Sequence, residues 1–319
     1  MKNHINFLHC AKSEDCQFRI DQLLSEHLKP YSRSQIQNWI KSGNLKINGE
    51  TCLIPKQKPQ LGDQIHLEAL IDDHSSVKAQ PILLDKIYED SDILLINKPS
   101  DLIVHPGAGN PDGTLMNALL FDCPQLSKLP RAGIVHRLDK NTTGIMIIAK
   151  TFESYHTLTQ MLADRNIQRE YIAIVDGNLK SGLTIDKPIA RHKTSRQKMA
   201  VCPNGKPAIS HVSLLNRFLF YTLVKVKLET GRTHQIRVHL NSIGHPVLGD
   251  PTYGKHKGYQ KLDPELAQTI LSFKRQALHA HILTFNHPIT NQPCQYTAPI
   301  PSDMQALIEG LKQSTHSTH

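Results

Sequence analysis

The sequence has few aromatic residues and no long apolar run. Phe, Trp and Tyr together make up 5% of the 319 residues, and there is one Trp. No segment approaches the ~18 consecutive apolar residues that indicate a membrane-spanning helix, and the first residues lack the apolar stretch of a secretory signal. We therefore expect a cytoplasmic protein with no membrane partner.

Sequence patterns of metal and cofactor sites are also missing. The six cysteines are scattered with no C-x-x-C pair, which indicates reduced thiols and not a zinc site or a disulfide framework. The sequence has no Walker loop, no H-E-x-x-H and no G-x-S-x-G motif, and the loop 107–112 lacks the third glycine of a dinucleotide fingerprint. We expect neither a metal ion nor a small-molecule cofactor.

The charge is unevenly distributed along the chain. Residues 17–60 hold seven Lys and Arg against three acidic residues, and residues 187–239 hold eleven against one. Residues 61–92, between these blocks, hold two against eight. Two basic blocks on either side of an acidic segment favour a polyanionic partner, because phosphate neutralisation supplies most of the non-specific affinity for nucleic acids. Ordinary solvated faces are the alternative that the charge alone leaves open.

The length of the chain predicts two domains, since a single core seldom extends beyond ~250–300 residues. The polar stretch 72–76 marks the connection between them. The boundaries that we expect are 1–16 for a flexible N-terminus, 17–75 for a small domain, 76–85 for a linker, 86–311 for a large domain and 312–319 for a flexible tail.

The small domain shows a helix–helix–hairpin order. Apolar residues at helical spacing predict a helix that ends before Pro30, and Ser32 and Gln35 form a capping box at the start of a second helix. Asn48 and Gly49 between two short apolar runs predict a tight hairpin. This order is similar to the S4 RNA-binding domain, and it implies RNA contacts from exposed residues of the second helix, namely Arg33, Gln37 and Lys41.

The apolar runs of the large domain predict strands separated by a few helices. Residues 144–149 form a continuous apolar run that is typical of a buried strand. Further along, Val224 and Val226 alternate with Lys225 and Lys227, which indicates a strand with one wet, basic face.

Two segments of the large domain carry residues suited to chemistry. In "GIVHRLDKNTTG", Asp139 stands between two cations in a loop just before the buried strand, a setting that favours an ionised carboxylate. Taken alone, this segment favours an ordinary turn. In "ETGRTHQIRVHL", the chain passes from the basic strand through Gly231 into a helix that carries Arg237, and alone it indicates a phosphate-binding patch.

Together these segments resemble the RluA-type family of RNA pseudouridine synthases. "HRLDKNTTG" matches the family's H-R-L-D-x-x-T-S/T-G signature, "REYIAIVDG" its tyrosine motif and "ETGRTHQIRVHL" its basic motif. "GHPVLGDPTYG" and "ALHAHILTFNHP" follow in family order, so the resemblance extends from the S4-like start to about residue 310. Asn141 departs from the Asp that is usual in the most similar members.

The resemblance implies both a fold and a reaction. The fold is α+β, with a catalytic domain around a mixed, mostly antiparallel sheet and the small S4-like domain before it. The reaction is the isomerisation of uridine to pseudouridine, which needs no cofactor. Asp139 is then either a nucleophile on C1′ or a base on the sugar, and Arg237 pairs with it. Tyr171 stacks on the uracil, and help in removing the C5 proton is a second role that stays open for it. Arg137 is implied as the wedge that replaces the flipped base, and phosphate contacts are implied for Arg232, Lys225 and Lys227.

Two further stretches, "LIVHPGAGNPDGT" and "PRAGIVHRLDK", are similar to family members that act on large-subunit ribosomal RNA. We therefore expect 23S ribosomal RNA or the assembling large subunit as the partner, with the modified uridines in the stem-loop that faces the decoding region. The alternatives are the same chemistry at another ribosomal RNA site or in tRNA, and a non-catalytic RNA-binding protein of ribosome assembly. The set of Asp139, Tyr171 and Arg237 argues against the last, because binding alone has no use for a carboxylate beside phosphates.

Overall fold

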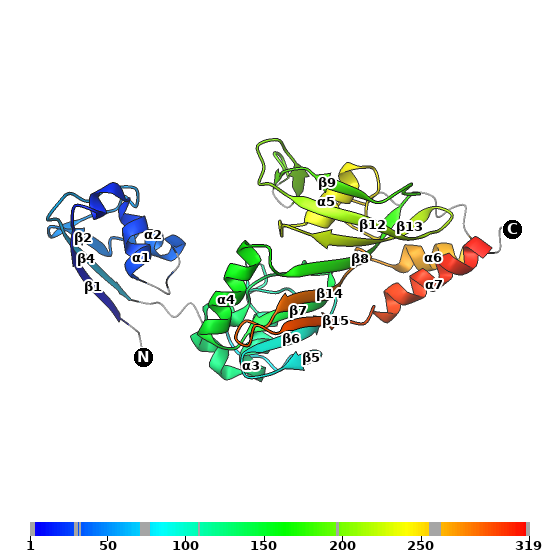
Figure 1. Ribbon diagram of the computed structural model, residues 1–319, viewed down its shortest axis with the longest axis horizontal. Helices are drawn as coiled ribbons and strands as arrows, with labels where there is room; N and C mark the ends of the chain where they lie inside the picture. The colour runs from blue at the N-terminus through cyan, green and yellow to red at the C-terminus, as the bar shows by residue number, and fades with distance from the viewer. Residues whose placement is uncertain are drawn as a thin grey trace. The chain divides into compact units, whose positions relative to one another are not determined.

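The computed structural model describes residues 4–28, 31, 33–70, 77–107, 109–195, 198–254 and 263–316. The chain forms two compact units, residues 1–77 and 78–319 (Figure 1). Within the described ranges, no helix combines the length and the apolarity needed to cross a bilayer. Ser32 and the polar stretch 72–76 lie outside these ranges.

The N-terminal unit combines two helices with a four-stranded antiparallel sheet. The strand order is β1 (His4–Cys10), β4 (Gln64–Leu70), β2 (Leu45–Ile47) and β3 (Glu50–Thr51). The helices are α1 (Ile20–His27) and α2 (Arg33–Lys41). Both helices contribute apolar side chains to one core cluster with the sheet, among them Ile20, Leu24 and Ile36. The hairpin at Asn48 and Gly49 is confirmed, because both residues have positive φ in the turn between β2 and β3.

The start of the chain is more ordered than its pattern indicates. The prediction of a flexible segment over 1–16 is wrong for residues 4–10, which form β1 and pair along their whole length with β4. Ile5 and Phe7 pack against the core of this unit. The next residue on this face is the polar His9, whose ring bonds to Asp15 at 2.8 Å. Only two alternate residues are therefore apolar, which is too few to indicate a strand.

The structure also differs from the predicted linker, 76–85, and from the predicted tail, 312–319. Within the predicted linker, the Lys78 carbonyl accepts a hydrogen bond from Asn117 at 2.8 Å, and the Gln80 N–H donates to the Asn117 carbonyl at 3.0 Å. These residues therefore belong to the second unit. Helix α7 (Ser302–His316) runs into the predicted tail, and its buried residues Leu307 and Leu311 lie just before the tail begins.

The second unit is built on a nine-stranded sheet with helices around it. The order is β5 (Lys86–Glu89), β6 (Ile93–Lys98), β7 (Thr143–Ala149), β14 (Leu278–Asn286), β8 (Gln168–Asp176), β13 (Tyr221–Leu228), β12 (Ile209–Arg217) and β9 (Leu183–Asp186), and β15 (Pro293–Thr297) also pairs with β14. The pairing is antiparallel throughout except between β7 and β14. The expected α+β class with a mixed, mostly antiparallel sheet is confirmed.

The other elements of this unit are connections and coverings. A separate two-stranded ribbon joins β10 (Ile189–Arg191) to β11 (Met199–Val201). The helices before α7 are α3 (Leu115–Asp122), α4 (Phe152–Ala163), α5 (Gln235–Ser242) and α6 (Pro264–Ser272), and the short 3-10 turns are η2 (Pro124–Lys128) and η3 (Pro130–Gly133). The helix α5 follows β13 closely in the sequence and carries one wall of the site described below.

The parallel contact between β7 and β14 anchors the loop that precedes β7. Thr143 pairs with His279 and Gly144 with Ala280. The Thr143 hydroxyl and Nδ1 of His279 are 2.9 Å apart, which adds a side-chain bond to the backbone pairing. The loop that carries Asp139 is therefore fixed at the centre of the sheet.

Glycine is required at position 144 for the two strands to approach. Its φ is +117°, and a Cβ atom there would lie 2.1 Å from the Ala280 carbonyl oxygen. We expect Gly144→Ala to lower the free energy of unfolding by about 3 kcal/mol or more, because overpacking adds to backbone strain.

The matched control for this prediction is Gly244→Ala. Gly244 has a φ of +83° with no atom within 4 Å of its added Cβ, so this variant carries backbone strain alone. Urea denaturation of the two variants measures the difference. Equal losses of stability would mean that the strands separate at no cost.

Candidate active site

The carboxylate of Asp139 is held by an arginine from a distant part of the chain. Asp139 lies in the loop before β7, and its carbonyl accepts the Thr142 N–H at 3.0 Å. Nη1 of Arg237, in the first turn of α5, donates to Oδ2 of Asp139 at 2.8 Å. The other oxygen, Oδ1, forms no hydrogen bond with any described residue and is the atom open to chemistry.

Arg237 is buried between two carboxylates. Its Nε and Nη2 donate to Asp250 at 2.6 and 2.9 Å, and the ring of Tyr253 lies 5.1 Å from the guanidinium carbon. Burial lowers the pKa of Arg237, but the hydrogen bonds to Asp250 and the charges of both carboxylates outweigh this effect and raise that pKa. Arg237 therefore stays charged and holds Asp139 in one orientation.

Asp250 is itself fixed by the backbone that follows it. The N–H groups of Thr252 and Tyr253 donate to its Oδ1 at 2.8 and 3.1 Å. Its side chain is 0% exposed, so Arg237 is its source of compensating charge.

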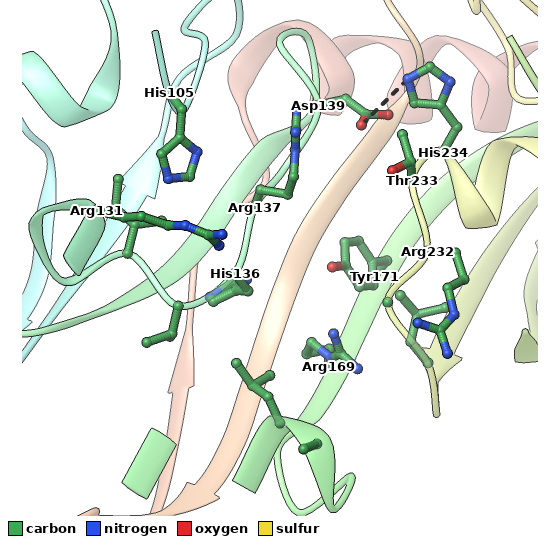
Figure 2. Close-up of a pocket in the computed structure, with 16 residues that line it drawn as sticks. His105, Arg131, His136, Arg137, Asp139, Arg169, Tyr171, Arg232, Thr233 and His234 are labelled. Atoms are coloured by element: carbon green, nitrogen blue, oxygen red, sulfur yellow. Dashed lines mark ion pairs between the residues drawn. The ribbon is translucent and has the colours of Figure 1, made fainter. Parts of the chain in front are cut away.

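Tyr171 lies on β8, where its backbone pairs with Val226 of β13 and Ala280 of β14. Its ring is buried and borders the same pocket as Asp139 (Figure 2). Burial raises the pKa of the hydroxyl, and the charge of Asp139 adds to the rise. Tyr171 is therefore neutral at physiological pH, a state suited to stacking and poorly suited to removing a proton.

Asp139 and Tyr171 line a pocket of about 380 Å³, a volume within the ~300–1,000 Å³ of small-molecule sites. Its lining is strongly basic and includes Arg131, Arg137, Arg169 and Arg232 (Figure 2). Arg131 and the next two residues all have positive φ, a costly backbone conformation that is concentrated at functional sites. The volume and the positive charge suit a nucleotide with its phosphate.

The predicted RNA contacts of this unit fall into two groups. Arg137 and Arg232 line the pocket together with Asp139. Lys225 and Lys227 are not among its lining residues; they lie on β13, and their ammonium groups contact side chains of the neighbouring strand β8. The structure therefore brings two of the four predicted RNA contacts, Arg137 and Arg232, to the pocket that Asp139 lines.

In the N-terminal unit, Arg33 and Gln37 contact a buried carboxylate that the sequence analysis missed. Both donate to Oδ2 of Asp21, Arg33 at 2.9 Å, and Arg19 adds a third donor at 3.2 Å. Burial raises the pKa of Asp21, but the bonds from Arg33 and Gln37 outweigh this and lower that pKa. The Arg33 side chain is still 41% exposed and Lys41 is exposed, so both place positive charge at the surface.

Among the described residues, one group has the spacing to hold a metal ion. It consists of His9, Asp15 and His27 of the N-terminal unit, whose ligand atoms lie within 4.8 Å of one another. Oδ2 of Asp15 already accepts hydrogen bonds from His9 and from the Lys12 N–H, both at 2.8 Å. The pocket at Asp139 is lined by cations, which disfavours a metal ion there.

Four further residues near Asp139 were not singled out from the sequence. Three of them, Asp250, Tyr253 and His234, lie in motifs that carry the family resemblance. The motifs pointed to these segments of the chain, but not to the contacts that the three side chains make in the site. Lys98 is fully buried and donates three hydrogen bonds to backbone carbonyls, one of them that of Lys140 at 2.9 Å. Burial lowers the pKa of Lys98 to about 7. Lys98 therefore ties the end of β6 to the loop that carries Asp139.

Comparison with known proteins agrees with this geometry. Residues 92–242 match the RNA pseudouridylate synthase family and residues 18–65 match the S4 domain. The chain is 46% identical to ribosomal large subunit pseudouridine synthase D of Vibrio parahaemolyticus, over 99% of this chain and 97% of that protein. It is 48% identical to the protein of the same name from Escherichia coli (strain K12), over 92% and 90% of the two chains.

The solved structures agree as well. Human RNA pseudouridylate synthase domain containing 4 matches 72% of this chain and 93% of its own with a TM-score of 0.57 and 25% identity. Human RNA pseudouridylate synthase domain containing 1 matches 73% and 96% with a TM-score of 0.54 and the same identity. The match to the Vibrio parahaemolyticus protein covers 99% of this chain at 46% identity. The chain therefore belongs to the RNA pseudouridine synthase family and carries an S4 domain at its N-terminus.

Proposed function

We propose that this protein isomerises uridines of 23S ribosomal RNA to pseudouridine, in the stem-loop that faces the decoding region. The observation that carries the proposal is the carboxylate of Asp139, held through Oδ2 by Arg237 and open through Oδ1 at a basic pocket that Tyr171 lines. The names of the relatives support large-subunit RNA as the substrate, and the S4 domain supports an RNA partner. The substrate is then free rRNA or an assembling large subunit in the cytoplasm.

In this reaction the N1–C1′ bond of uridine breaks, the uracil turns within the pocket, and C5 bonds to C1′. C5 loses its proton and N1 ends with one, so the substrate gains no atom and loses no electrons. Asp139 has two ways to begin. In the first, Oδ1 attacks C1′ as the nucleophile of a retaining glycosidase does, and the Oδ1–C1′ bond breaks when C5 bonds to C1′. In the second, Oδ1 takes a proton from the sugar while the N1–C1′ bond breaks, and it returns that proton when C5 bonds to C1′. Arg237 holds the carboxylate in position through Oδ2 in either case.

The uridine has to leave its base stack before Asp139 can reach the sugar, which costs a few kcal/mol. Arg137 is two residues before Asp139 in the same loop and lines the same pocket. When Arg137 enters the base stack, Asp139 in the same loop is therefore brought to the sugar of the flipped uridine. Tyr171 then stacks on the uracil, and Arg232 contacts the phosphate of the flipped nucleotide.

The substrate class is tested with transcripts that carry [5-³H]uridine, because only chemistry at C5 releases this label. We expect the full-length protein to release tritium from 23S rRNA and not from 16S rRNA or tRNA. Faster release from tRNA would move the substrate to that class. No release from any transcript, nor from assembling large subunits that carry the label, would leave an RNA-binding assembly protein. Carbodiimide mapping of the 23S product checks that the new pseudouridines lie in the proposed stem-loop.

Deleting residues 1–77 removes one compact unit together with its basic residues Arg33 and Lys41. We expect the affinity for structured rRNA to fall about tenfold or more, since several phosphate contacts are lost. Turnover of a short stem-loop and the near-ultraviolet circular dichroism of the remaining unit should persist. Filter binding and unfolding curves measure both effects, and an insoluble fragment would show that the second unit depends on the first.

A further inference from the structure

His234 has a strained backbone directly before α5. Its φ of 56° places a non-glycine residue in the left-handed region, where His, Asn and Asp are the better tolerated side chains. This conformation places the imidazole between two groups. Nδ1 lies 2.8 Å from the Tyr253 hydroxyl. On the other side of the ring, Nε2 lies 3.8 Å from Oδ1 of Asp139 (Figure 2). Backbone strain of this kind persists where the surrounding structure requires it.

The partners of Tyr253 determine which imidazole nitrogen carries the proton. The Met199 N–H donates to the Tyr253 hydroxyl oxygen at 2.8 Å. Among the described residues, Nδ1 of His234 is then the acceptor within reach of the hydroxyl hydrogen. A nitrogen that accepts cannot carry a proton, so the neutral ring has its N–H on Nε2.

The other side of the ring favours the same tautomer. Nε2 faces the carboxylate of Asp139, and a carboxylate is stabilised by an N–H and repelled by a lone pair. Burial lowers the pKa of His234, and the positive charges of Arg237 and Arg137 lower it further. The carboxylates of Asp139 and Asp250 raise this pKa, but they do not outweigh the burial. The ring is therefore neutral at physiological pH and has one N–H to direct.

We propose that Tyr253 fixes His234 in the Nε2–H tautomer and that His234 directs this N–H at Oδ1 of Asp139, the oxygen that Arg237 leaves open. His234 is a positioning residue in this scheme, because it acts on the substrate through Asp139. The proposal rests on the proposed function, in which Oδ1 is the reacting atom. The separation of 3.8 Å is longer than a hydrogen bond, and such contacts shorten when substrate closes the site.

Two amide variants test the direction of the N–H. The side-chain nitrogen of Gln reaches about as far as Nε2 of His, whereas that of Asn reaches only as far as Nδ1. We expect H234N to lower kcat about 30-fold and H234Q about threefold, with KM for the RNA within twofold of wild type in both. Equal losses of kcat in the two variants, or losses confined to KM, would overturn the proposal.

A double-mutant cycle tests whether Tyr253 acts through His234. Y253F keeps the ring that packs on Arg237 and removes only the hydroxyl. We expect Y253F to lower kcat about fivefold in the wild-type background and to have no effect in the H234N background, since coupled residues are not additive. The same loss in both backgrounds would mean that Tyr253 acts through Arg237 or Met199 instead.

The tautomer itself is measured without RNA. Two-bond ¹H–¹⁵N spectra of the full-length protein, labelled with ¹⁵N in its histidine rings, identify the protonated nitrogen of each ring, and the signal missing from H234N identifies His234. We expect the Nε2–H pattern in wild type and a mixture of tautomers in Y253F. The Nδ1–H pattern in wild type would overturn the proposal even if tritium is released from 23S rRNA. The Nε2–H pattern without any tritium release would refute the proposed function alone.

Discussion

Asp139→Asn is expected to abolish tritium release from 23S rRNA that carries [5-³H]uridine, with a loss of at least ~10⁴-fold. The amide neither attacks C1′ nor takes a proton from the sugar, so both routes open to Asp139 are closed. Its oxygen can still accept the bond from Arg237, which keeps the shape of the site. We therefore expect the affinity for RNA and the free energy of unfolding to stay close to those of wild type.

The matched control is Asn141→Asp in the same loop. It adds a carboxylate two residues from Asp139 and restores the residue that is usual in the most similar family members, so activity should stay within about twofold of wild type. Filter binding and urea unfolding of both variants separate lost chemistry from lost structure. Tritium release by the Asp139→Asn variant at a rate near that of wild type would show that Asp139 is not the catalytic residue.

Arg237→Met is expected to remove activity and also to destabilise the fold, because the buried Asp250 is left without its counter-ion. Loss of one partner from such a pair costs about 3–5 kcal/mol in the free energy of unfolding. Asp139 in turn loses the donor that holds Oδ2, so the orientation of its carboxylate is no longer fixed.

A second substitution separates these two effects. In the double variant Arg237→Met with Asp250→Asn, no buried carboxylate is left uncompensated, and we expect most of the lost stability to return while activity stays absent. Urea unfolding and tritium release are measured on both variants. Activity that returns together with stability would mean that Arg237 serves only the fold.

Local signals along the chain predicted the elements that form the site. The apolar run before residue 150 is the buried strand β7, the alternation around Lys225 is β13, and the segment after Gly231 turns into α5. Each of these depends on neighbouring residues alone, which is why periodicity is sufficient to find them. The pairing of Asp139 with Arg237 was implied by the family resemblance, since no local pattern connects residues so far apart.

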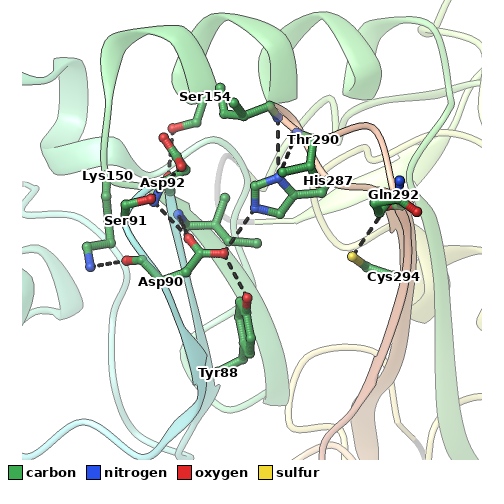
Figure 3. A network of polar contacts seen from close by, with 12 residues as sticks. Tyr88, Asp90, Ser91, Asp92, Lys150, Ser154, His287, Thr290, Gln292 and Cys294 are labelled. Carbon is green, nitrogen blue, oxygen red and sulfur yellow. Dashed lines mark hydrogen bonds and ion pairs between the residues drawn. The ribbon is translucent and has the colours of Figure 1, made fainter.

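Contacts between distant segments were beyond a sequence-based prediction. The turn at Asp90 is formed by neighbouring residues, since Oδ1 of Asp90 accepts the N–H groups of Asp92 and Ile93. Its Oδ2 accepts from the Tyr88 hydroxyl at 2.8 Å and bonds to His287 at 3.0 Å, a residue that follows β14 (Figure 3). The same holds for Asp250 and Tyr253, whose importance comes from Arg237 and His234 across the fold.

The parallel pairing of β7 with β14 sets the order in which a newly made chain becomes an enzyme. A chain that has grown to residue 254 already contains Asp139, Arg237 and Asp250, but it lacks the strand that joins β7 to β8 at the centre of the sheet. Contacts between strands so far apart in sequence form late, whereas all strands and helices of the N-terminal unit lie within residues 1–77 and are synthesised first. The protein is therefore ready to bind RNA during its own synthesis well before it can modify it.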